Sequence, residues 1–230
     1  MLGAQNVIDA AIYNGVKKVI ALSTDKAAAP INLYGATKLT SDKLFIAANN
    51  YSGVHKIKFS VVRYGNVMGS RGSVIPFFLK QKENGVLPIT DERMTRFSIT
   101  LQEGVDFVLK CLDKMWGGEL FVPIIPSYRI LDLAQAIAPE AKRKIIGLRP
   151  GEKLHEEMIT QTDAMNTIEF DDYFAILPNS KYLEWDRESF LNETNATKGK
   201  YCKDGFSYNS DTNQYFLTVD ELREFIKNHI

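Results

Sequence analysis

Short apolar runs alternate with longer helical segments in the first third of the chain. Residues 18–23 and 58–64 are rich in β-branched and other apolar side chains, as in strands that a sheet buries on both faces. Residues 32–48, between them, have the length of a long helix, and residues 4–14 carry apolar side chains at helical spacing. Strands separated by such helices form parallel sheets. The sequence therefore predicts an α/β fold with a doubly wound parallel sheet.

The rest of the chain predicts further elements of both kinds. The expected helices cover 74–82, 101–115 and 130–138, with a last one after a capping box at 218–221; the expected strands cover 119–123, 144–148 and 173–177; and 179–212 reads as loops. The predicted architecture is a partial doubly wound (Rossmann-type) parallel sheet with a smaller α/β domain.

Charge and cysteine content exclude several classes of protein. The 28 basic and 28 acidic residues cancel, which argues against a partner such as nucleic acid or a membrane surface that is held by bulk charge. Two cysteines are too few for a disulfide scaffold, and no His–Cys spacing suits a metal, so we expect none. There is no export signal and no apolar run of membrane-spanning length, which favours the cytoplasm.

One expected motif is absent from these residues. A doubly wound nucleotide-binding sheet normally begins with a strand and a G-x-G-x-x-G turn, which holds a pyrophosphate at a helix N-terminus. No such turn occurs in the 230 residues, which begin with a predicted helix. Two interpretations stay open: the fold is not a dinucleotide fold, or its first half is missing.

Tyr34 and Lys38 lie four residues apart on the long predicted helix. This spacing places the ammonium beside the phenol, where it stabilises the phenolate and lets Tyr34 take or give a proton during hydride transfer. About one such pair is expected by chance in a chain of this composition, and Tyr13 with Lys17 is a second. Context favours Tyr34, because it follows a buried strand at the edge where open α/β sheets bind ligands.

Thr24, Asp25 and Lys26 come directly after the first predicted strand. A hydroxyl, a carboxylate and an amine in sequence are compatible with an ordinary turn capped by Asp25. The nearby Tyr34 favours a second interpretation, in which the carboxylate and the amine act as acid and base on neighbouring carbons of one substrate.

Four long stretches carry a family resemblance. They are residues 21–38, 62–78, 88–97 and 146–156. The chain resembles the extended short-chain dehydrogenase/reductase superfamily, and more narrowly the nucleotide-sugar 4,6-dehydratases that act on UDP-N-acetylglucosamine, invert C5 and open the pseudaminic acid pathway, which serves flagellin glycosylation. Ordinary sugar 4,6-dehydratases carry Asp-Glu where this chain has Asp25–Lys26. Membrane-anchored retaining relatives tend to have Met where this chain has Tyr34.

The resemblance implies a reaction that uses NADP as cofactor. Hydride leaves C4 of the sugar, the C5 proton is removed, water leaves from C6, and hydride returns to C6. Tyr34 then deprotonates the C4 hydroxyl with help from Lys38, and Thr24 binds the C4 oxygen. Lys26 is the candidate C5 base and Asp25 the candidate acid for the departing water, although the two roles can be exchanged.

The resemblance also implies the binding residues. The cofactor set is Leu22, Ser23, Tyr34, Lys38, Val67, Met68, Gly69, Ser70 and Arg71, and the substrate set is Asn66, Val74, Thr90 and Arg149. Simpler interpretations exist for two of these residues: Arg149 could form a surface ion pair with Glu152, and Asn66 could be a turn residue. Residues 1–65 and about 95–125 would form the C-terminal part of the dinucleotide-binding domain. Residues 66–94 and about 126–230 would form the substrate-binding region.

Family members begin with the glycine fingerprint, and about three strand–helix units, roughly 100 residues, precede the point that matches Met1. We therefore expect the chain alone to expose a sheet edge, to bind NADP⁺ weakly and to show no measurable turnover. Two alternatives stay open: a sugar-nucleotide-binding or assembly module without catalysis, and a retaining 4,6-dehydratase. The resemblance further implies a homo-oligomer.

Overall fold

The computed structural model describes residues 1–52, 56–179, 185–193 and 198–229. These residues divide into two compact units. The first unit comprises Met1–Tyr64, Val105–Ile124 and Glu157–Ser207. The second comprises Gly65–Gly104, Ile125–Glu156 and Tyr208–Ile230. Each unit has elements of both kinds, in agreement with the predicted α/β class.

The first unit is built on a six-stranded sheet with the order β1-β2-β6-β11-β10-β12. Its strands are β1 (Lys18–Thr24), β2 (Lys58–Tyr64), β6 (Leu120–Pro123), β10 (Thr167–Glu169), β11 (Tyr173–Ile176) and β12 (Lys200–Tyr201). The other elements of this unit are α1 (Leu2–Tyr13), η1 (Asp25–Ala27), α2 (Leu33–Ala48), β9 (Glu157–Ile159), α6 (Gln161–Ala164), α7 (Arg187–Glu193) and most of α4 (Leu101–Lys114). The strands β1, β2 and β6 are parallel, as predicted, whereas β11 pairs antiparallel with β6 and β10.

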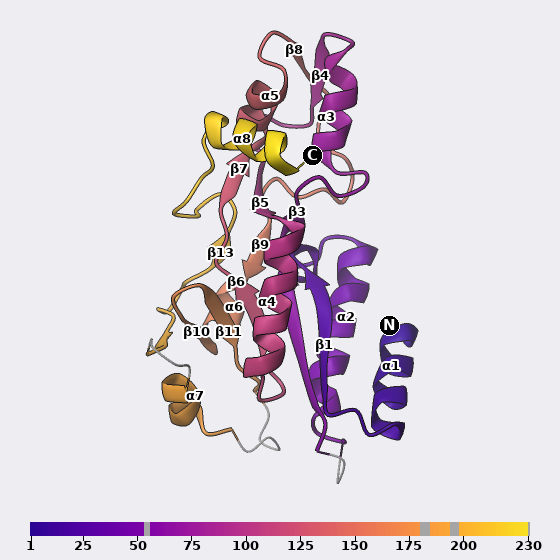
Figure 1. Ribbon diagram of the computed structural model, residues 1–230, viewed down its shortest axis with the longest axis vertical. Helices are drawn as coiled ribbons and strands as arrows, with labels where there is room; N and C mark the ends of the chain where they lie inside the picture. The colour runs from indigo at the N-terminus through magenta and orange to yellow at the C-terminus, as the bar shows by residue number, and fades with distance from the viewer. Residues whose placement is uncertain (53–55, 180–184, 194–197, 230) are drawn as a thin grey trace. The chain divides into compact units, whose positions relative to one another are not determined.

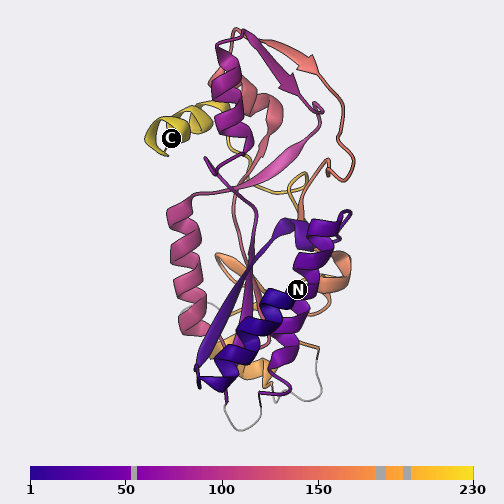
Figure 2. The same ribbon diagram turned by 90° about the vertical axis from the view of Figure 1, so that its right-hand side faces the viewer.

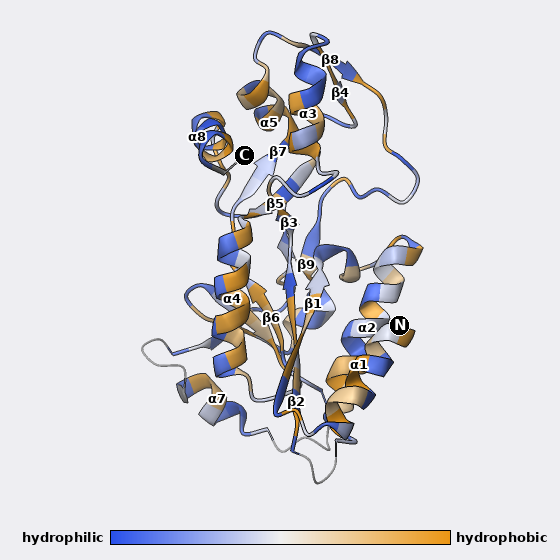
Figure 3. Cartoon of the chain, turned by 45° about the vertical axis from the view of Figure 1, so that its right-hand side comes forward, coloured by the Kyte–Doolittle hydropathy of each residue, from blue (hydrophilic) through white to orange (hydrophobic). Residues whose placement is uncertain are grey.

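Helices cover the two faces of this sheet (Figure 1 and Figure 2). On one face, α2 lies against β1 and β2, and α1 lies beside α2. On the other face, Phe107 and Cys111 of α4 join Val62 and Phe121 in a buried apolar cluster. Successive side chains of a strand point to opposite faces, so Val62 faces this cluster and its neighbour Arg63 faces α2. Colouring by hydropathy shows the apolar centre of the sheet between these helices (Figure 3).

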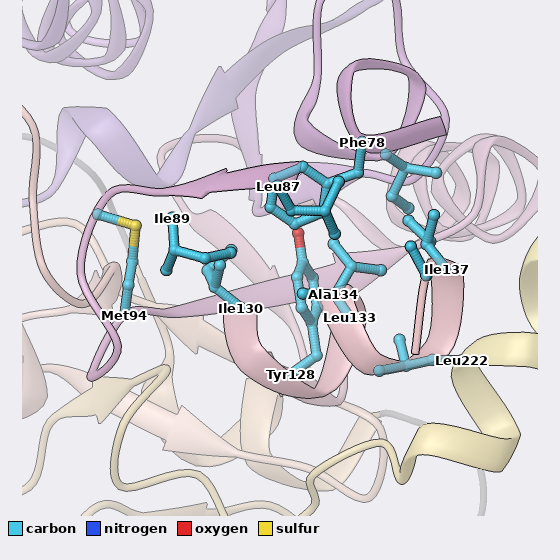
Figure 4. Packing of buried hydrophobic residues seen from close by; sticks show 12 residues of the cluster. Phe78, Leu87, Ile89, Met94, Tyr128, Ile130, Leu133, Ala134, Ile137 and Leu222 are labelled. Carbon is cyan, nitrogen blue, oxygen red and sulfur yellow. The ribbon is translucent and has the colours of Figure 1, made fainter. Parts of the chain in front are cut away.

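The second unit has two small sheets and its own core. One sheet has the order β3-β5-β7 and the other pairs β4 with β8. The elements are β3 (Asn66–Val67), α3 (Val74–Lys82), β4 (Val86–Ile89), β5 (Thr95–Ile99), β7 (Ser127–Arg129), α5 (Ile130–Ile137), β8 (Lys142–Ile145), β13 (Tyr208–Asn209) and α8 (Val219–His229). Phe78, Leu87 and Leu133 lie at the centre of the core, and Leu222 of α8 packs against α5 (Figure 4).

Two of the differences from the predictions lie within residues 157–212. The segment Glu157–Ser207 belongs to the first unit, because β10 and β11 extend the sheet beyond β6. We expected residues 179–212 to be loops, but α7 lies within this range: Asp186 accepts the backbone N–H groups at its start, and Phe190 is buried against Trp116. Residues 180–184 and 194–197 of this range lie outside the described residues. No helix in the described part of the chain is both long and apolar enough to span a membrane.

The stability of the first unit is expected to fall as pH rises, because of Glu119. This residue is fully buried before β6, where its two carboxylate oxygens accept the N–H groups of Trp116 and Gly117 at 2.6 and 2.8 Å. Burial raises the pKa of Glu119 to about 7, although these hydrogen bonds oppose the shift. The folded chain therefore binds this proton more tightly than the unfolded chain, and the gain is lost as pH rises through about 7.

We expect the titration of Glu119 to make the free energy of unfolding, measured with urea, about 2 kcal/mol higher at about pH 5.5 than at about pH 8. Glu119→Gln removes the titrating carboxyl group, so the difference between the wild-type and variant pH profiles isolates its effect. Parallel profiles for the two proteins would show that Glu119 does not titrate in this range.

Candidate active site

The polar turn after β1 brings Thr24, Asp25 and Lys26 together. The Thr24 hydroxyl donates to Asp25 Oδ1 at 2.8 Å, and Lys26 Nζ donates to the same oxygen at 2.9 Å. Thr24 also caps the 3₁₀ turn η1, because its hydroxyl accepts the Lys26 N–H at 3.3 Å. Asp25 is only 1% exposed, and its second oxygen, Oδ2, has no hydrogen-bond partner among the described residues. A buried carboxyl oxygen without a hydrogen-bond partner is unusual in a folded protein, and a functional role is one explanation for it.

The predicted Tyr34–Lys38 pair lies on α2. The side chain of Asn32 caps this helix by accepting the Gly35 N–H at 2.8 Å. Tyr34 is 55% exposed, so its phenol is accessible to a ligand. Lys38 Nζ donates to the carbonyl oxygen of Leu22 at 2.8 Å, which holds the ammonium at the end of β1. The helix therefore presents Tyr34 and Lys38 to the carboxyl edge of the sheet.

Gly35 allows α2 to lie directly on the turn that holds Asp25. A Cβ atom at this position would be 2.3 Å from the Lys26 carbonyl oxygen and 3.0 Å from Pro30 Cβ. Real Cβ atoms do not approach a backbone oxygen so closely, so a larger residue would push the first turn of the helix away from η1. Gly35 is not among the residues predicted from the sequence. A glycine within a predicted helix, directly after the candidate Tyr34, was the signal that could have indicated it.

Gly35→Ala is expected to lower the free energy of unfolding by about 1–3 kcal/mol, because the added methyl group meets backbone rather than open space. Gly3→Ala in α1 is the matched control, since no neighbouring atom of the described residues lies within 4 Å of its added Cβ. The free energy of unfolding of the control should rise by up to about 1 kcal/mol, because alanine has a higher helix propensity than glycine. Urea unfolding of both variants measures the two effects. A stabilised Gly35→Ala variant would contradict the close packing of α2 on η1.

Ser23 and Tyr64 flank these groups. The Ser23 hydroxyl donates to Asp42 Oδ2 at 2.7 Å, so it faces α2 in this structure. Its implied contact with a cofactor ribose stays a prediction. Tyr64 ends β2 opposite Thr24. Burial raises the pKa of Tyr64, and the neighbouring Tyr34 adds to the shift. Tyr64 therefore stays a neutral phenol near Tyr34.

The second unit holds the remaining candidate residues, beginning with the loop that follows β2. Asn66 lies in β3, and its Oδ1 is buried without a hydrogen-bond partner in the described parts of the chain. Met68 N donates to Ile99 O at 2.9 Å, and Gly69 has a φ of 71°, which glycine adopts most easily. Of the implied cofactor residues, Val67 ends β3, and Met68, Gly69, Ser70 and Arg71 follow it directly and precede Val74, which begins α3.

Thr90 and Arg149 lie beyond the same end of the β4–β8 pair. Ile89 pairs with Ile145 in the parallel register, and Ile146 N donates to Ile89 O at 2.9 Å. The segments that lead to Thr90 and to Arg149 therefore leave this sheet in the same direction. Arg149 is exposed.

The turn that begins at Arg149 is held together by a second arginine. Arg149 N donates to the Glu152 carboxylate, which also lies 3.7 Å from Arg96. Arg96 is buried and donates to the carbonyl oxygens of Lys153 and Leu154. Arg96 is not among the residues predicted from the sequence, although an arginine inside the buried strand β5 is an unusual feature.

A buried polar cluster in the same unit was also missed. Thr95 Oγ1 lies 2.8 Å from His155 Nδ1 and 2.7 Å from Ser210 Oγ, and Ser210 Oγ accepts the Glu156 N–H at 2.9 Å. Thr95 thus shares one hydrogen bond with the Ser210 hydroxyl and another with the His155 imidazole. His155 thus lies in a bend shortly before β9 and is hydrogen-bonded to Thr95.

Comparison with protein families identifies a match over most of the chain. The model of the family described as "Polysaccharide biosynthesis protein" matches residues 1–178. The chain is 58% identical over 229 residues to the "UDP-N-acetylglucosamine 4,6-dehydratase (inverting)" of Campylobacter jejuni serotype O:2, covering 99% of this chain and 68% of that protein. It is 38% identical to the "UDP-glucose 4-epimerase" of Rickettsia conorii, and this match covers 99% of this chain and 69% of that protein.

Solved structures agree with this result. The structure of Pen from Bacillus thuringiensis is similar with a TM-score of 0.85 at 37% identity, covering 99% of this chain and 68% of that chain. A dTDP-4-dehydrorhamnose reductase from Clostridium acetobutylicum shares the fold, with a TM-score of 0.57 at 16% identity, 98% of this chain and 70% of that one. The chain thus spans about two thirds of the length of these proteins. It belongs to the polysaccharide biosynthesis protein family within the extended short-chain dehydrogenase/reductase superfamily, as a relative of the inverting UDP-N-acetylglucosamine 4,6-dehydratases.

Proposed function

We propose that this chain carries the acid–base site of an NADP-dependent dehydratase that converts UDP-N-acetylglucosamine into a 4-keto-6-deoxy sugar nucleotide with inverted C5. The observation that carries the proposal is the turn after β1. Lys26 and Thr24 both donate to one oxygen of Asp25, and the other oxygen is buried without a partner in the described structure. An amine and a carboxyl group held side by side can remove a proton from one carbon and protonate a leaving group on the next.

The residues at the end of β1 fit the nicotinamide end of a dinucleotide. Leu22 is half exposed, and Lys38 lies at its carbonyl oxygen with donors left for a ribose hydroxyl. The glycine turn that would bind the pyrophosphate does not occur in these residues. When bound, the nicotinamide takes hydride from C4 of the sugar and supplies hydride to C6.

The chain's own residues carry the proton transfers. Tyr34 is exposed on α2 and takes the proton of the C4 hydroxyl, while the Lys38 ammonium, one helical turn later, stabilises the phenolate. The Thr24 hydroxyl has one proton, so it turns from Asp25 Oδ1 to donate to the C4 oxygen, which gains carbonyl character as the sugar is oxidised. The C4 carbonyl then acidifies the proton on C5.

Dehydration uses the Asp25–Lys26 pair. The Lys26 amine takes the C5 proton, which requires Lys26 to be neutral at that moment, and its proton can pass to the Asp25 oxygen that it contacts. Asp25 donates a proton to the C6 hydroxyl, which leaves as water. A bound nicotinamide would supply hydride to C6, and C5 would then take a proton from solvent on the opposite face of the ring. Because the proton is removed from one face of C5 and added to the other, the configuration at C5 is inverted.

Binding of the nucleotide is assigned to the second unit. The Asn66 amide and the Arg149 guanidinium are suited to the diphosphate, since an exposed arginine binds phosphate oxygens bidentately. Val74 and Thr90 complete the proposed substrate contacts. The choice of NADP over NAD, the cytoplasmic location, the homo-oligomeric state and the role in pseudaminic acid synthesis are parts of this proposal that the sequence resemblance supports.

Mass spectrometry of the reaction product tests the proposed function. Two proteins are assayed. One is the 230-residue chain alone, and the other, called the joined protein, is a fusion of this chain with the part of the Campylobacter jejuni relative that it does not match. We expect the joined protein with NADP⁺ to convert UDP-N-acetylglucosamine into a product that has lost one water. An isomer of unchanged mass would indicate an epimerase, and binding without any product would indicate a binding module. Either result would overturn the proposal.

A further inference from the structure

Three buried polar residues lie beneath the helix that carries Tyr34 and Lys38. Asp42 of α2 is 2% exposed and Arg63 of β2 is 3% exposed. Asp42 Oδ2 accepts the Ser23 hydroxyl at 2.7 Å and Arg63 Nη2 at 3.2 Å. One carboxylate oxygen therefore links the helix to two neighbouring strands.

The register of the sheet explains this geometry. Ser23 lies directly opposite Arg63 in the parallel β1–β2 pair, so both side chains point to the face that α2 covers. Asp42 is one helical turn beyond Lys38 on α2 and faces the same side of the helix. Since Lys38 contacts the carbonyl oxygen of Leu22, the helix is fixed to β1 at two successive residues of the strand.

A contribution to stability alone does not explain why Asp42, Arg63 and Ser23 are buried together. Taking both charges out of water is unfavourable, and a buried ion pair is often no more stabilising than apolar residues of the same size. Arg63 also donates Nη1 to Met158 O at 2.8 Å, but its Nε–H has no partner in the described part of the chain. Burial raises the pKa of Asp42, while Arg63, Ser23 and Lys38 oppose the shift. Lys38 and Asp42 therefore act on each other electrostatically.

We propose that Asp42, held by Arg63 and Ser23, is a positioning residue that sets the placement of α2 and thereby of Lys38 and Tyr34 at the end of β1. The proposal rests on the proposed function for the roles of Tyr34 and Lys38. It assigns no contact with substrate or cofactor to Asp42 or Arg63. Asp42 and Arg63 act on the site only through α2 and through Lys38.

The test measures the site without turnover, in the 230-residue chain. The rate at which an amine-acylating reagent modifies Lys38 is followed by peptide mass spectrometry, and the NMR signal of the Tyr34 ring is assigned with Tyr34→Phe. In Asp42→Asn we expect the Lys38 rate to rise about tenfold, equal to ~1.4 kcal/mol, and the Tyr34 signal to shift. Asp163→Asn is the matched control, because that carboxylate lies 3.9 Å from Arg63 but is not on α2. It should change neither readout.

The double variant Asp42→Leu with Arg63→Met separates positioning from stability. Apolar side chains of similar size can restore the unfolding midpoint, but they cannot hold the helix through Ser23. We expect the double variant to keep the altered Lys38 rate and Tyr34 signal. Wild-type readouts in a folded double variant would overturn the proposal.

A milder variant covers the case in which Asp42→Asn does not fold. Ser23→Ala removes one hydrogen bond to Asp42 and keeps the ion pair, so it should produce a smaller change of the same sign. Wild-type readouts in Ser23→Ala would then overturn the proposal. Failure to detect a dehydrated product bears on the proposed function alone, since neither readout needs substrate.

Discussion

Replacement of Lys26 by alanine in the joined protein is expected to reduce exchange of the sugar C5 proton with solvent deuterium by at least about 10²-fold, the usual contribution of a general base. The Lys26 amine is the proposed acceptor of this proton, and it is already held 2.9 Å from the carboxylate that can receive the proton next. Binding of UDP-N-acetylglucosamine should change little, because the proposed diphosphate ligands lie in the second unit. NMR of the sugar in deuterated buffer measures the exchange.

Tyr34→Phe should block the reaction one step earlier. Without a base for the C4 hydroxyl, no reduced nicotinamide should appear and C5 exchange should also be lost. Tyr13→Phe is the matched control, since Tyr13 has the same spacing to a lysine but is 89% exposed and ends α1. It should behave as wild type. Unchanged C5 exchange in Lys26→Ala would remove Lys26 from the base role.

The second large effect concerns the cofactor. We expect the 230-residue chain to bind NADP⁺ at least about 10³-fold more weakly than the joined protein, because about three charge-assisted hydrogen bonds to the pyrophosphate are missing, each worth about 1.5–3 kcal/mol. The residues at the end of β1 can contact only the nicotinamide end of the molecule. UDP-N-acetylglucosamine affinity should differ far less, since Asn66, Thr90 and Arg149 are present in both proteins.

Titration calorimetry of each ligand against each protein separates these two effects. The UDP-sugar serves as the internal control, because a misfolded chain would lose both affinities together. Micromolar NADP⁺ affinity in the 230-residue chain would contradict the argument that a glycine turn is required, and it would point to a different binding mode for the pyrophosphate.

Local patterns were sufficient to predict the elements that carry the catalytic candidates. The strands β1 and β2 and the helices α2 and α3 agree with their predicted ranges to within one residue. Apolar runs and a capping residue such as Asn32 are encoded within a few neighbouring positions, so they can be read without tertiary information.

The elements that were missed depend on distant partners. All five residues of β5 are buried, although three of them are polar. Groups far along the chain satisfy the side chains of Thr95 and Arg96 and the backbone N–H of Ser98. A search for apolar periodicity cannot find such a strand. The short strands β10 and β12 likewise form only by pairing with other strands of the completed sheet.

In the candidate site, too, local features could be predicted from the sequence, and contacts between distant residues could not. The adjacency of Thr24, Asp25 and Lys26 and the Tyr34–Lys38 spacing were visible in the sequence, and the structure adds their contacts. Close packing at Gly35 and the link between Asp42 and Arg63 were not visible, since each joins residues that no local pattern relates.

The configuration at C5 of the product tests the central claim most directly. The joined protein is incubated with UDP-N-acetylglucosamine and NADP⁺ in deuterated buffer, and the product is examined by proton NMR. The proposed roles of Asp25 and Lys26 predict a 4-keto-6-deoxy sugar with inverted C5 that carries one deuterium from solvent at that carbon. A dehydrated product with retained C5 configuration would contradict the account and would assign the chain to a retaining dehydratase.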